Sequence, residues 1–419
     1  MTASISGAAV DGQGFVNAGK LLRMQTTDGF DGLRCMDCEQ QVGADGDASQ
    51  CPCGGALEPI YDQETLAVAH EELFDGDDGF ARRLTRLEAV LPFEASAIPT
   101  LEEGGTPVVD CPSLAEETDV DTVLVKDEAR NSTGGITDRE MAVAVAAADQ
   151  QGANEVALPT TGNAGQSAAA YAARAGLDST SFVPSRANFA NKAMINVHGG
   201  EMNVVGGRYG DAAAAFEAER EDQSWYSLEA FETPYRHEGA KTLAYELVSD
   251  LGRAPDAVVH PTGHGTGFVG LFRGFRELAS TGTIDGLPRL YAAQPEGCAP
   301  IVAAREAGEK EATAVEQPDT ISGPLEIPDP SGGKYVLDAI DASAGGAVAV
   351  PDKTLLEEAV SLAQAGVATS ATGGTGVGGL KALAEEDAFS SEETVVVVNP
   401  TSANREADLL RSHLMSKGI

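Results

Sequence analysis

Four cysteines near the start of the sequence have a spacing suited to a metal ion. Cys35 and Cys38 are separated by two residues, and Cys51 and Cys53, separated by one, follow about a dozen residues later. Two such pairs can supply four thiolates to one tetrahedral zinc ion, and the two glycines after the second pair allow a tight turn. The spacing predicts a structural zinc ribbon. The alternative is a loop of reduced cysteines, because the second pair departs from the usual C-x-x-C.

Two glycine-containing turns have residue types that can bind an anion. Thr160-Thr161-Gly162-Asn163-Ala164-Gly165 lies between a predicted strand and a predicted helix, and Pro261-Thr262-Gly263-His264-Gly265-Thr266-Gly267 follows another predicted strand. Glycine lets the backbone approach a ligand closely, and a helix N-terminus favours negative charge. Glycines at alternate positions can also expose successive N–H groups as an anion-binding nest. Taken alone, the first is a common strand-to-helix turn and the second a weak indication of anion binding.

Alternating strands and helices are expected from Val120 onward, and they would position these turns. The predicted strands span residues 123–126, 155–158, 180–183, 201–205, 257–260 and 393–399. The predicted helices include residues 138–150, 166–175 and 402–414. Such alternation predicts an α/β fold with mainly parallel sheets. Ligands of such folds bind at the carboxyl ends of the strands, where both glycine turns would lie.

The charge of the chain excludes some classes of partner. The formal net charge is −37, from 65 acidic and 28 basic residues. Such an excess would repel the phosphates of nucleic acids and of anionic membranes, so neither is expected as a partner. The acidic residues are scattered along the chain and only nine of the basic residues are lysines, which indicates a halophile-like surface.

Nothing in the sequence predicts export or membrane insertion. No segment has the roughly 18 consecutive apolar residues of a membrane helix. Residues 1–15 lack the basic region and apolar run of a signal peptide. The two remaining cysteines, Cys111 and Cys298, are isolated, which is not a disulfide framework. We therefore expect a soluble cytoplasmic protein.

One further stretch identifies a family. Residues 131–139 read N-S-T-G-G-I-T-D-R and resemble the N-P-T-G-S-F-K-D-R motif of threonine synthases, which are pyridoxal phosphate (PLP) enzymes. Residues 234–242, 294–300 and 345–350 resemble other segments of that family in the same order. The resemblance runs from about residue 33 to about residue 383, and this collinearity is more specific than any single motif.

The resemblance implies an architecture. Fold-type II PLP enzymes have two open, mostly parallel sheets flanked by helices, with the ligand in the cleft between them, and here a zinc ribbon would precede them. We expect residues 1–60 to form the zinc-ribbon-like module and residues 126–245 a smaller α/β domain. The larger PLP-type domain would combine residues 61–125 and 246–419. Members of the family are monomers or dimers, and the sequence leaves both open.

The resemblance also implies roles for individual residues. Asn163 would contact the 3′-hydroxyl of PLP, and either Thr372 or Thr375 would face its pyridine nitrogen. The residues that would hold the PLP phosphate are Gly263, His264, Gly265, Thr266 and Gly267. The residues that would face a small amino-acid substrate or ligand are Thr160, Thr161 and Lys192. An ordinary surface role is the alternative for Lys192.

The sequence departs from the family where its chemistry depends most on one residue. Thr137 stands where the family has the lysine that forms a Schiff base with PLP, and a hydroxyl cannot form that imine because the reaction needs a primary amine. Further departures are Ser132 for proline, Ile136 for an aromatic residue, Glu140 for glycine, and a missing glutamate near residue 370. Lys126 or Lys241 would have to supply the amine instead, but Lys126 matches a second, structural lysine of the family.

These observations lead to two hypotheses about function. The resemblance implies a lyase that converts O-phospho-L-homoserine and water to L-threonine and phosphate, impaired here by Thr137. The alternative is a non-catalytic paralogue that binds PLP or an amino acid without a covalent bond, or that regulates an active relative. A zinc-dependent binding module would account only for the first 60 residues.

Overall fold

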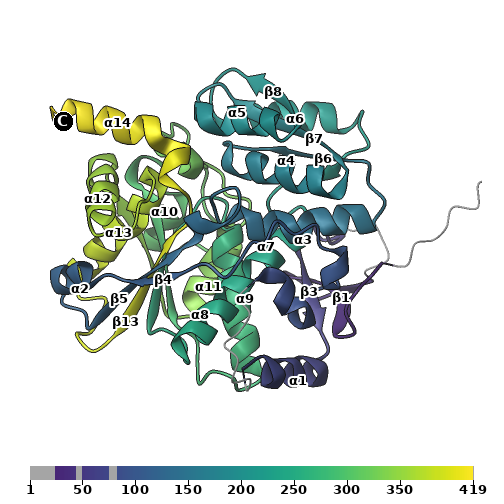
Figure 1. Ribbon diagram of the computed structural model, residues 1–419, viewed down its shortest axis with the longest axis horizontal. Coiled ribbons are helices and arrows are strands. Elements are labelled where there is room, and N and C mark those ends of the chain that lie inside the picture. Colours follow the sequence, from purple (N-terminus) through teal and green to yellow (C-terminus); the bar gives the residue numbers. More distant parts are fainter. Residues whose placement is uncertain (1–23, 44–49, 75–82, 419) are drawn as a thin grey trace, which may run out of the picture.

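The computed structural model describes residues 24–43, 50–74 and 83–418, and their strands form three sheets (Figure 1). The N-terminal module is therefore described only in part. Residues 1–15, for which the sequence predicts no signal peptide, lie outside the described ranges. Two of the three sheets consist of strands that alternate with helices and are parallel almost throughout. The predicted α/β fold is confirmed.

The largest sheet has six strands in the order β12-β11-β10-β13-β5-β4, and all neighbours are parallel except β4 and β5. The four consecutive valines of β13 are almost fully buried, as expected for a strand covered on both faces. The strands are β4 (Val108–Asp110), β5 (Thr122–Asp127), β10 (Ala257–Pro261), β11 (Arg289–Pro295), β12 (Gly346–Val350) and β13 (Thr394–Asn399).

Glycines allow a helix to lie close against this sheet. Helix α13 packs on four of its strands. Cβ atoms at Gly376 and Gly379 would lie only 3.0 and 2.9 Å from side chains of β13 and β11. The helices of this part are α2 (Pro112–Thr118), α8 (Thr242–Leu251), α9 (Thr266–Ser280), α10 (Pro300–Ala307), α11 (Gly333–Ala342), α12 (Asp352–Gln364), α13 (Ala371–Glu385) and α14 (Ala407–Ser416).

The second parallel sheet has four strands in the order β8-β7-β6-β9. It lies above the larger sheet in Figure 1, with α3 and α7 between the two. Its strands are β6 (Glu155–Pro159), β7 (Asp178–Pro184), β8 (Glu201–Val205) and β9 (Tyr226–Ser227). The helices of this part are α3 (Thr137–Gln150), α4 (Asn163–Ala175), α5 (Phe189–Val197), α6 (Tyr209–Arg220) and α7 (Tyr235–Ala240).

The N-terminal strands form a small antiparallel sheet in the order β2-β1-β3, followed by a helix. This module docks on α11, where the Tyr335 hydroxyl accepts a hydrogen bond of 2.9 Å from the backbone N–H of Ala56 and Lys334 pairs with Asp37 at 2.7 Å. Its elements are β1 (Phe30–Cys35), β2 (Gln41–Val42), β3 (Leu57–Tyr61) and α1 (Gln63–Phe74). Short 3-10 helices span Leu84–Val90, Ala95–Ala97, Glu128–Arg130, Glu296–Cys298, Gly323–Leu325 and Ala403–Glu406.

Three predicted helices differ at their boundaries. Helix α4 begins at Asn163, three residues before the predicted start at residue 166. Helix α3 begins at Thr137, one residue earlier than expected, and α7 holds it in place through a backbone contact: a Cβ at Gly239 would lie 2.0 Å from the carbonyl oxygen of Arg139. The predicted helix 402–414 is instead a 3-10 turn followed by α14. The turn places Arg405 and Glu406 in the interior, with only 4% and 1% of each exposed, which a continuous exposed helix would not do.

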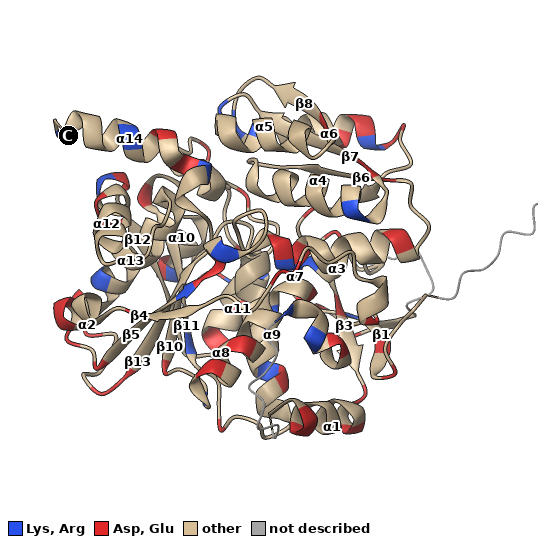
Figure 2. Ribbon diagram, viewed as in Figure 1, with Lys and Arg blue, Asp and Glu red and all other residues tan. Residues whose placement is uncertain are grey.

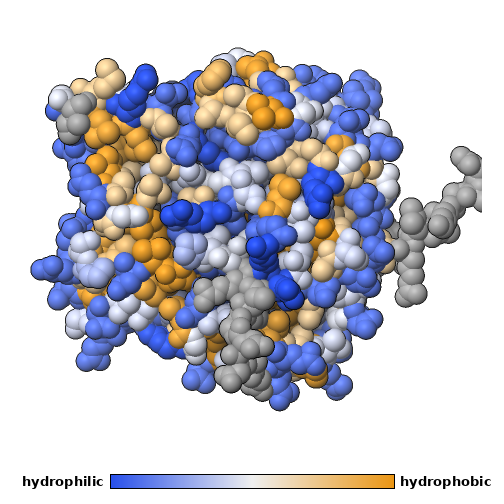
Figure 3. Space-filling model, in the orientation of Figure 1, coloured by the Kyte–Doolittle hydropathy of each residue, from blue (hydrophilic) through white to orange (hydrophobic). Residues whose placement is uncertain are grey.

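The acidic residues are distributed over the described chain. Asp and Glu are spread over many helices and loops in Figure 2 instead of one segment. Hydrophobic residues are also visible, among them those over α5 and β8 in Figure 3, where Phe189, Val197 and Val204 are exposed. Within the described residues, no helix is long and apolar enough to cross a membrane.

Candidate functional site

The ends of strands from both parallel sheets meet at one cleft. Parallel sheets place their carboxyl ends, and the helix N-termini that follow, at the same edge, so such clefts are the usual ligand sites of α/β folds. Five segments that line it matter below: the start of α3 with Thr137 and Glu140; Thr160, Thr161 and Asn163 after β6; residues 260–267 after β10; Thr372 of α13; and Arg405 after β13.

Thr137 lines the cleft at the first turn of α3. Its hydroxyl lies 2.7 Å from that of Ser167, which in turn donates to the buried carboxylate of Asp138 at 2.7 Å. Asp138 also accepts from the backbone N–H of Thr133 at 2.6 Å, and burial raises its pKa. Thr137 is thus part of a hydrogen-bonded cluster of hydroxyls around one carboxylate, and it offers no amine.

No lysine among the described residues lines the cleft. The ammonium group of Lys126 is buried 2.8 Å from Glu246 and 3.4 Å from Asp250, and it also donates to the Thr106 carbonyl. Buried charges of this kind are stable only when they are paired. Lys126 is therefore committed to a structural ion pair, as the sequence comparison with the family suggests.

Lys241 is committed in the same way. It pairs with Glu238 and with Glu277, the latter at 2.9 Å, and its ammonium group lies 4.0 Å from the centre of the Tyr61 ring. The side chain is fully buried beneath the N-terminal module, away from the cleft lining.

The turn after β10 presents free backbone donors to the cleft. No described residue accepts a hydrogen bond from the N–H groups of Gly263, His264, Gly265, Thr266 or Gly267, all of which line the cleft. Gly265 has a φ of 98°, and a Cβ there would lie 2.5 Å from the side chain of Val336, so only glycine fits. Convergent N–H groups at the start of α9 make a site for a phosphate or similar anion.

The His264 side chain closes one side of this turn. Its ring packs against Tyr209 at 5.0 Å, and its Nδ1 lies 3.2 Å from the hydroxyl of Ser331. Burial, reinforced by Arg236, lowers the pKa of His264, so the ring is neutral at pH 7. His264 can therefore shape the turn but adds no positive charge for an anion.

The turn after β6 is held by its own side chains. The Thr160 hydroxyl accepts hydrogen bonds of 3.0 Å from the N–H groups of Gly162 and Gly165. The Oδ1 atom of Asn163 accepts from Asn191 at 2.8 Å, which fixes the orientation of the Asn163 amide at the start of α4. Asn163 and Thr161 both line the cleft.

The structure shows which of Thr372 and Thr375 lines the cleft, a choice that the sequence left open. Thr372 lines the cleft, whereas Thr375 is fully buried one turn deeper and donates to the Ala371 carbonyl. Lys192 does not line the cleft, and its ammonium group donates to the backbone carbonyl of Ser185 at 2.7 Å. The cleft lining therefore includes all the residues for which the sequence predicts contact with PLP or a substrate, except Thr375 and Lys192.

Two charged groups of the cleft, the Glu140–Arg236 pair and Arg405, were not predicted from the sequence. Glu140, noted only as a departure from glycine, accepts hydrogen bonds of 3.0 and 2.7 Å from Arg236, so the pair fills space that glycine would leave open. Arg405 reaches the cleft from the segment after β13. No motif marks it, because an arginine a few residues beyond a strand has no pattern of its own.

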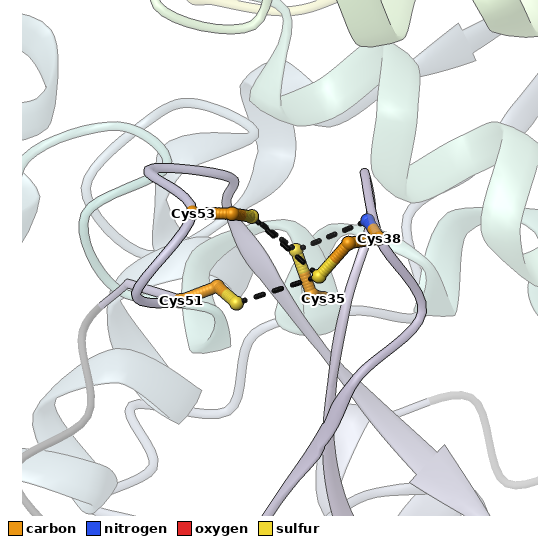
Figure 4. A group of neighbouring side chains, drawn as sticks. All are labelled: Cys35, Cys38, Cys51 and Cys53. Carbon is orange, nitrogen blue, oxygen red and sulfur yellow. Dashed lines mark hydrogen bonds between the residues drawn. The ribbon is translucent and has the colours of Figure 1, made fainter.

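The four clustered cysteines converge as the spacing predicts (Figure 4). Cys35 and Cys38 come from the end of β1 and Cys51 and Cys53 from a facing loop, and their sulfur atoms all lie within 4.8 Å of one another. Burial raises the pKa of Cys35, but backbone N–H donors of Cys38 and Asp37 outweigh it and hold the pKa at about 7. The pKa of Cys51 moves the other way: a backbone N–H of Cys53 lowers it, but burial and the neighbouring thiols outweigh this and raise it to about 12. The support for a zinc site is therefore the convergence of the four sulfur atoms.

Comparison with known proteins agrees with this geometry. Residues 99–401 match the family described as pyridoxal-phosphate dependent enzyme. The threonine synthase of Methanocaldococcus jannaschii is 32% identical over 380 residues, which cover 90% of this chain and 93% of that protein. The threonine synthase of Methanosarcina acetivorans is 31% identical over 370 residues, which cover 87% and 90%.

Solved structures share the fold at lower identity. Diaminopropionate ammonia lyase from Escherichia coli has a TM-score of 0.64 at 16% identity, covering 85% of this chain and 92% of that one. Maize serine racemase has a TM-score of 0.63 at 18% identity, covering 75% and 94%. The fold-type II architecture expected from the sequence is confirmed. This chain belongs to the pyridoxal-phosphate dependent enzymes and, within them, to the threonine synthase family.

Proposed function

We propose that this protein binds PLP, or a closely related phosphate-bearing pyridine, in the cleft without a covalent bond and does not carry out the threonine synthase reaction. One observation carries the proposal: the cleft keeps the phosphate turn at residues 263–267 and Asn163 but has no lysine among its described residues. Gly265 to Gly267 would hold the phosphate, and Thr372 would lie near the pyridine nitrogen.

The missing amine is the reason for the expected loss of activity. PLP acts as an electron sink when it is bound to an amine. In this chain Thr137 can only hold a hydrogen bond beside it, because a hydroxyl can neither condense with the aldehyde nor shuttle a proton as a lysine does. The Glu140–Arg236 pair supports the same view, since it fills a position that is glycine in the family. The conversion of O-phospho-L-homoserine to L-threonine would therefore be lost.

Borohydride trapping tests the proposal. The protein, purified in high salt, is mixed with PLP, and its visible spectrum is compared before and after borohydride. We expect saturable binding of PLP and no PLP attached to any peptide. Trapped PLP on Lys126, Lys241 or another lysine would refute the proposal, and the peptide would identify the amine.

Restoring the lysine tests whether the rest of the cleft survives. Thr137→Lys should become trappable by borohydride, whereas Thr137→Met, which has a side chain of comparable length but no amine, should not. If PLP binds to neither the parent nor Thr137→Lys, the cleft is not a PLP site and the proposal is wrong.

We also propose a zinc ion at Cys35, Cys38, Cys51 and Cys53, with a structural role. Support comes from the convergence of the four sulfur atoms and from the docking of this module on α11.

The division of the chain at residues 60, 125 and 245 is a further proposal. It is supported by the membership of β6 to β9 in the smaller sheet. We further propose that the protein binds a small-molecule ligand, is a monomer or a dimer, is located in the cytoplasm and is adapted to high salt.

A further inference from the structure

Arg405 differs from the other buried arginines of the described chain in lacking a carboxylate partner. Four arginines have less than a tenth of their surface exposed, and Arg405 is 4% exposed. The three others form ion pairs: Arg139 with Glu128 and Glu246, Arg236 with Glu140, and Arg273 with Glu58 and Glu238. No ion pair joins Arg405 to a described residue, and one terminal nitrogen, NH1, is buried without a hydrogen-bond partner.

The other two nitrogens of Arg405 hold the guanidinium in place. Nε donates to the Thr133 carbonyl at 3.0 Å, and NH2 donates to the same carbonyl at 2.7 Å and to the Thr133 hydroxyl at 2.6 Å. Gly135 leaves room for the third nitrogen, since a Cβ there would lie 3.1 Å from NH1. The guanidinium is therefore fixed against the loop that precedes Thr137. Arg405 and Thr137 line the same cleft.

A buried cation with an unused donor is costly unless an anion meets it. Burial lowers the pKa of Arg405 to about 10, so the group still carries its charge at pH 7. Asp138 is linked to Arg405 through the Thr133 hydroxyl, which accepts from NH2 and donates to the Asp138 carboxylate, but Asp138 makes no hydrogen bond with NH1. Glu406 also acts on Arg405 through its charge, but it forms no ion pair with it; its Oε2 accepts from the backbone N–H of Thr372 at 2.9 Å, and its Oε1 is buried without a hydrogen-bond partner.

We propose that Arg405 binds the carboxylate of a small ligand through NH1, at the side of the cleft where Thr137 has replaced the lysine. This deepens the proposed function and rests on it only in taking the ligand to be held without a covalent bond. An arginine suits such a site because it stays protonated and offers a planar, charged donor, whereas it cannot form an imine. The phosphate turn at residues 263–267 is a different segment of the same cleft lining.

Binding of acetate to the full-length protein tests the site. Acetate labelled with carbon-13 at its carboxylate is titrated at constant salt, and broadening of its NMR signal is followed for the parent, Arg405→Met, Arg405→Lys and Arg411→Met. Arg411 is an exposed arginine of the neighbouring helix α14 and serves as the matched control. We expect saturable binding to the parent and to Arg411→Met, and about tenfold or greater weakening in Arg405→Met, since one charge-assisted hydrogen bond is lost.

Several results would overturn the inference. They are the absence of saturable acetate binding to the parent, and equal affinity in Arg405→Met. Circular dichroism shows whether each variant is folded. If Arg405→Met is not, Arg405→Lys decides, because a flexible ammonium should bind more weakly than the fixed guanidinium, and equal affinity would refute the site. PLP titration of the same samples separates the two proposals: acetate binding without PLP binding leaves this site standing and refutes the proposed function, and PLP binding without acetate binding does the reverse.

Discussion

Replacing Lys126 by methionine should destabilise the fold and leave the result of borohydride trapping with PLP unchanged. The Lys126 ammonium is fully buried, and three oxygens contact it, from Glu246 at 2.8 Å, Asp250 at 3.4 Å and the Thr106 carbonyl at 2.7 Å. Methionine fills the volume but removes the charge from this group of carboxylates. Breaking a buried pair from one side costs about 3–5 kcal/mol, because the partner charge stays behind. Arg139 still pairs with Glu246, which favours the lower end of that range.

Urea unfolding followed by circular dichroism measures the loss, and borohydride trapping of PLP is run on the same samples. Lys353→Met is the control, because Lys353 is not buried and its loss should change the free energy of unfolding by less than about 0.5 kcal/mol. The reasoning is refuted if Lys126→Met is as stable as the control. It is also refuted if the parent gives a trapped PLP adduct that this variant loses, since Lys126 would then be the reactive amine.

Three further predictions concern the cleft, the cysteine cluster and acid stability. Gly265→Ala should weaken PLP binding at least about tenfold, because a Cβ would lie 2.5 Å from Val336 and distort the phosphate turn; a fluorescence titration with PLP checks this, and Gly286→Ala, where a Cβ meets nothing within 4 Å, should bind normally. Metal analysis should find one zinc per chain, and Cys51→Ser should lose it and lower the melting temperature; zinc-free, equally stable parent protein would contradict this. Burial raises the pKa of Glu246, but Arg139 and Lys126 outweigh it and lower the pKa to about 2. Its contribution to stability is therefore complete above its unfolded pKa near 4.5 and is lost as the pH falls toward 2. Urea unfolding at several pH values measures it, and unchanged stability across that window would count against the ion pair.

The sequence predicted the scaffold of the cleft because local patterns determine it. Valine-rich runs such as that of β13 and the alanine-rich α3 mark strands and helices, and glycines mark the turns between them. In a parallel sheet the turns after β6 and β10 must then lie at carboxyl ends. The sequence also shows threonine at position 137, because comparison with the family motif is enough to identify that position.

The orientation of single side chains was not predictable in this way. Thr372 and Thr375 lie one helical turn apart on the same side of α13, and only the depth of the helix in the core separates them. Lys192 is directed to a backbone carbonyl of its own domain because α5 packs beside β8, outside the cleft. Arg405 depends on a 3-10 turn that replaces the start of a predicted helix, so neither its burial nor its contact with Thr133 has a local signal.

Position 137 and the ion pairs of the core are separate features of the structure. The buried charges on Lys126, Arg139 and Glu246 are all paired within the core, and none lines the cleft. Thr137 lines the cleft, and its hydroxyl contacts that of Ser167. Arg405 also lines the cleft, and its unpartnered NH1 group is the basis of the proposed carboxylate site.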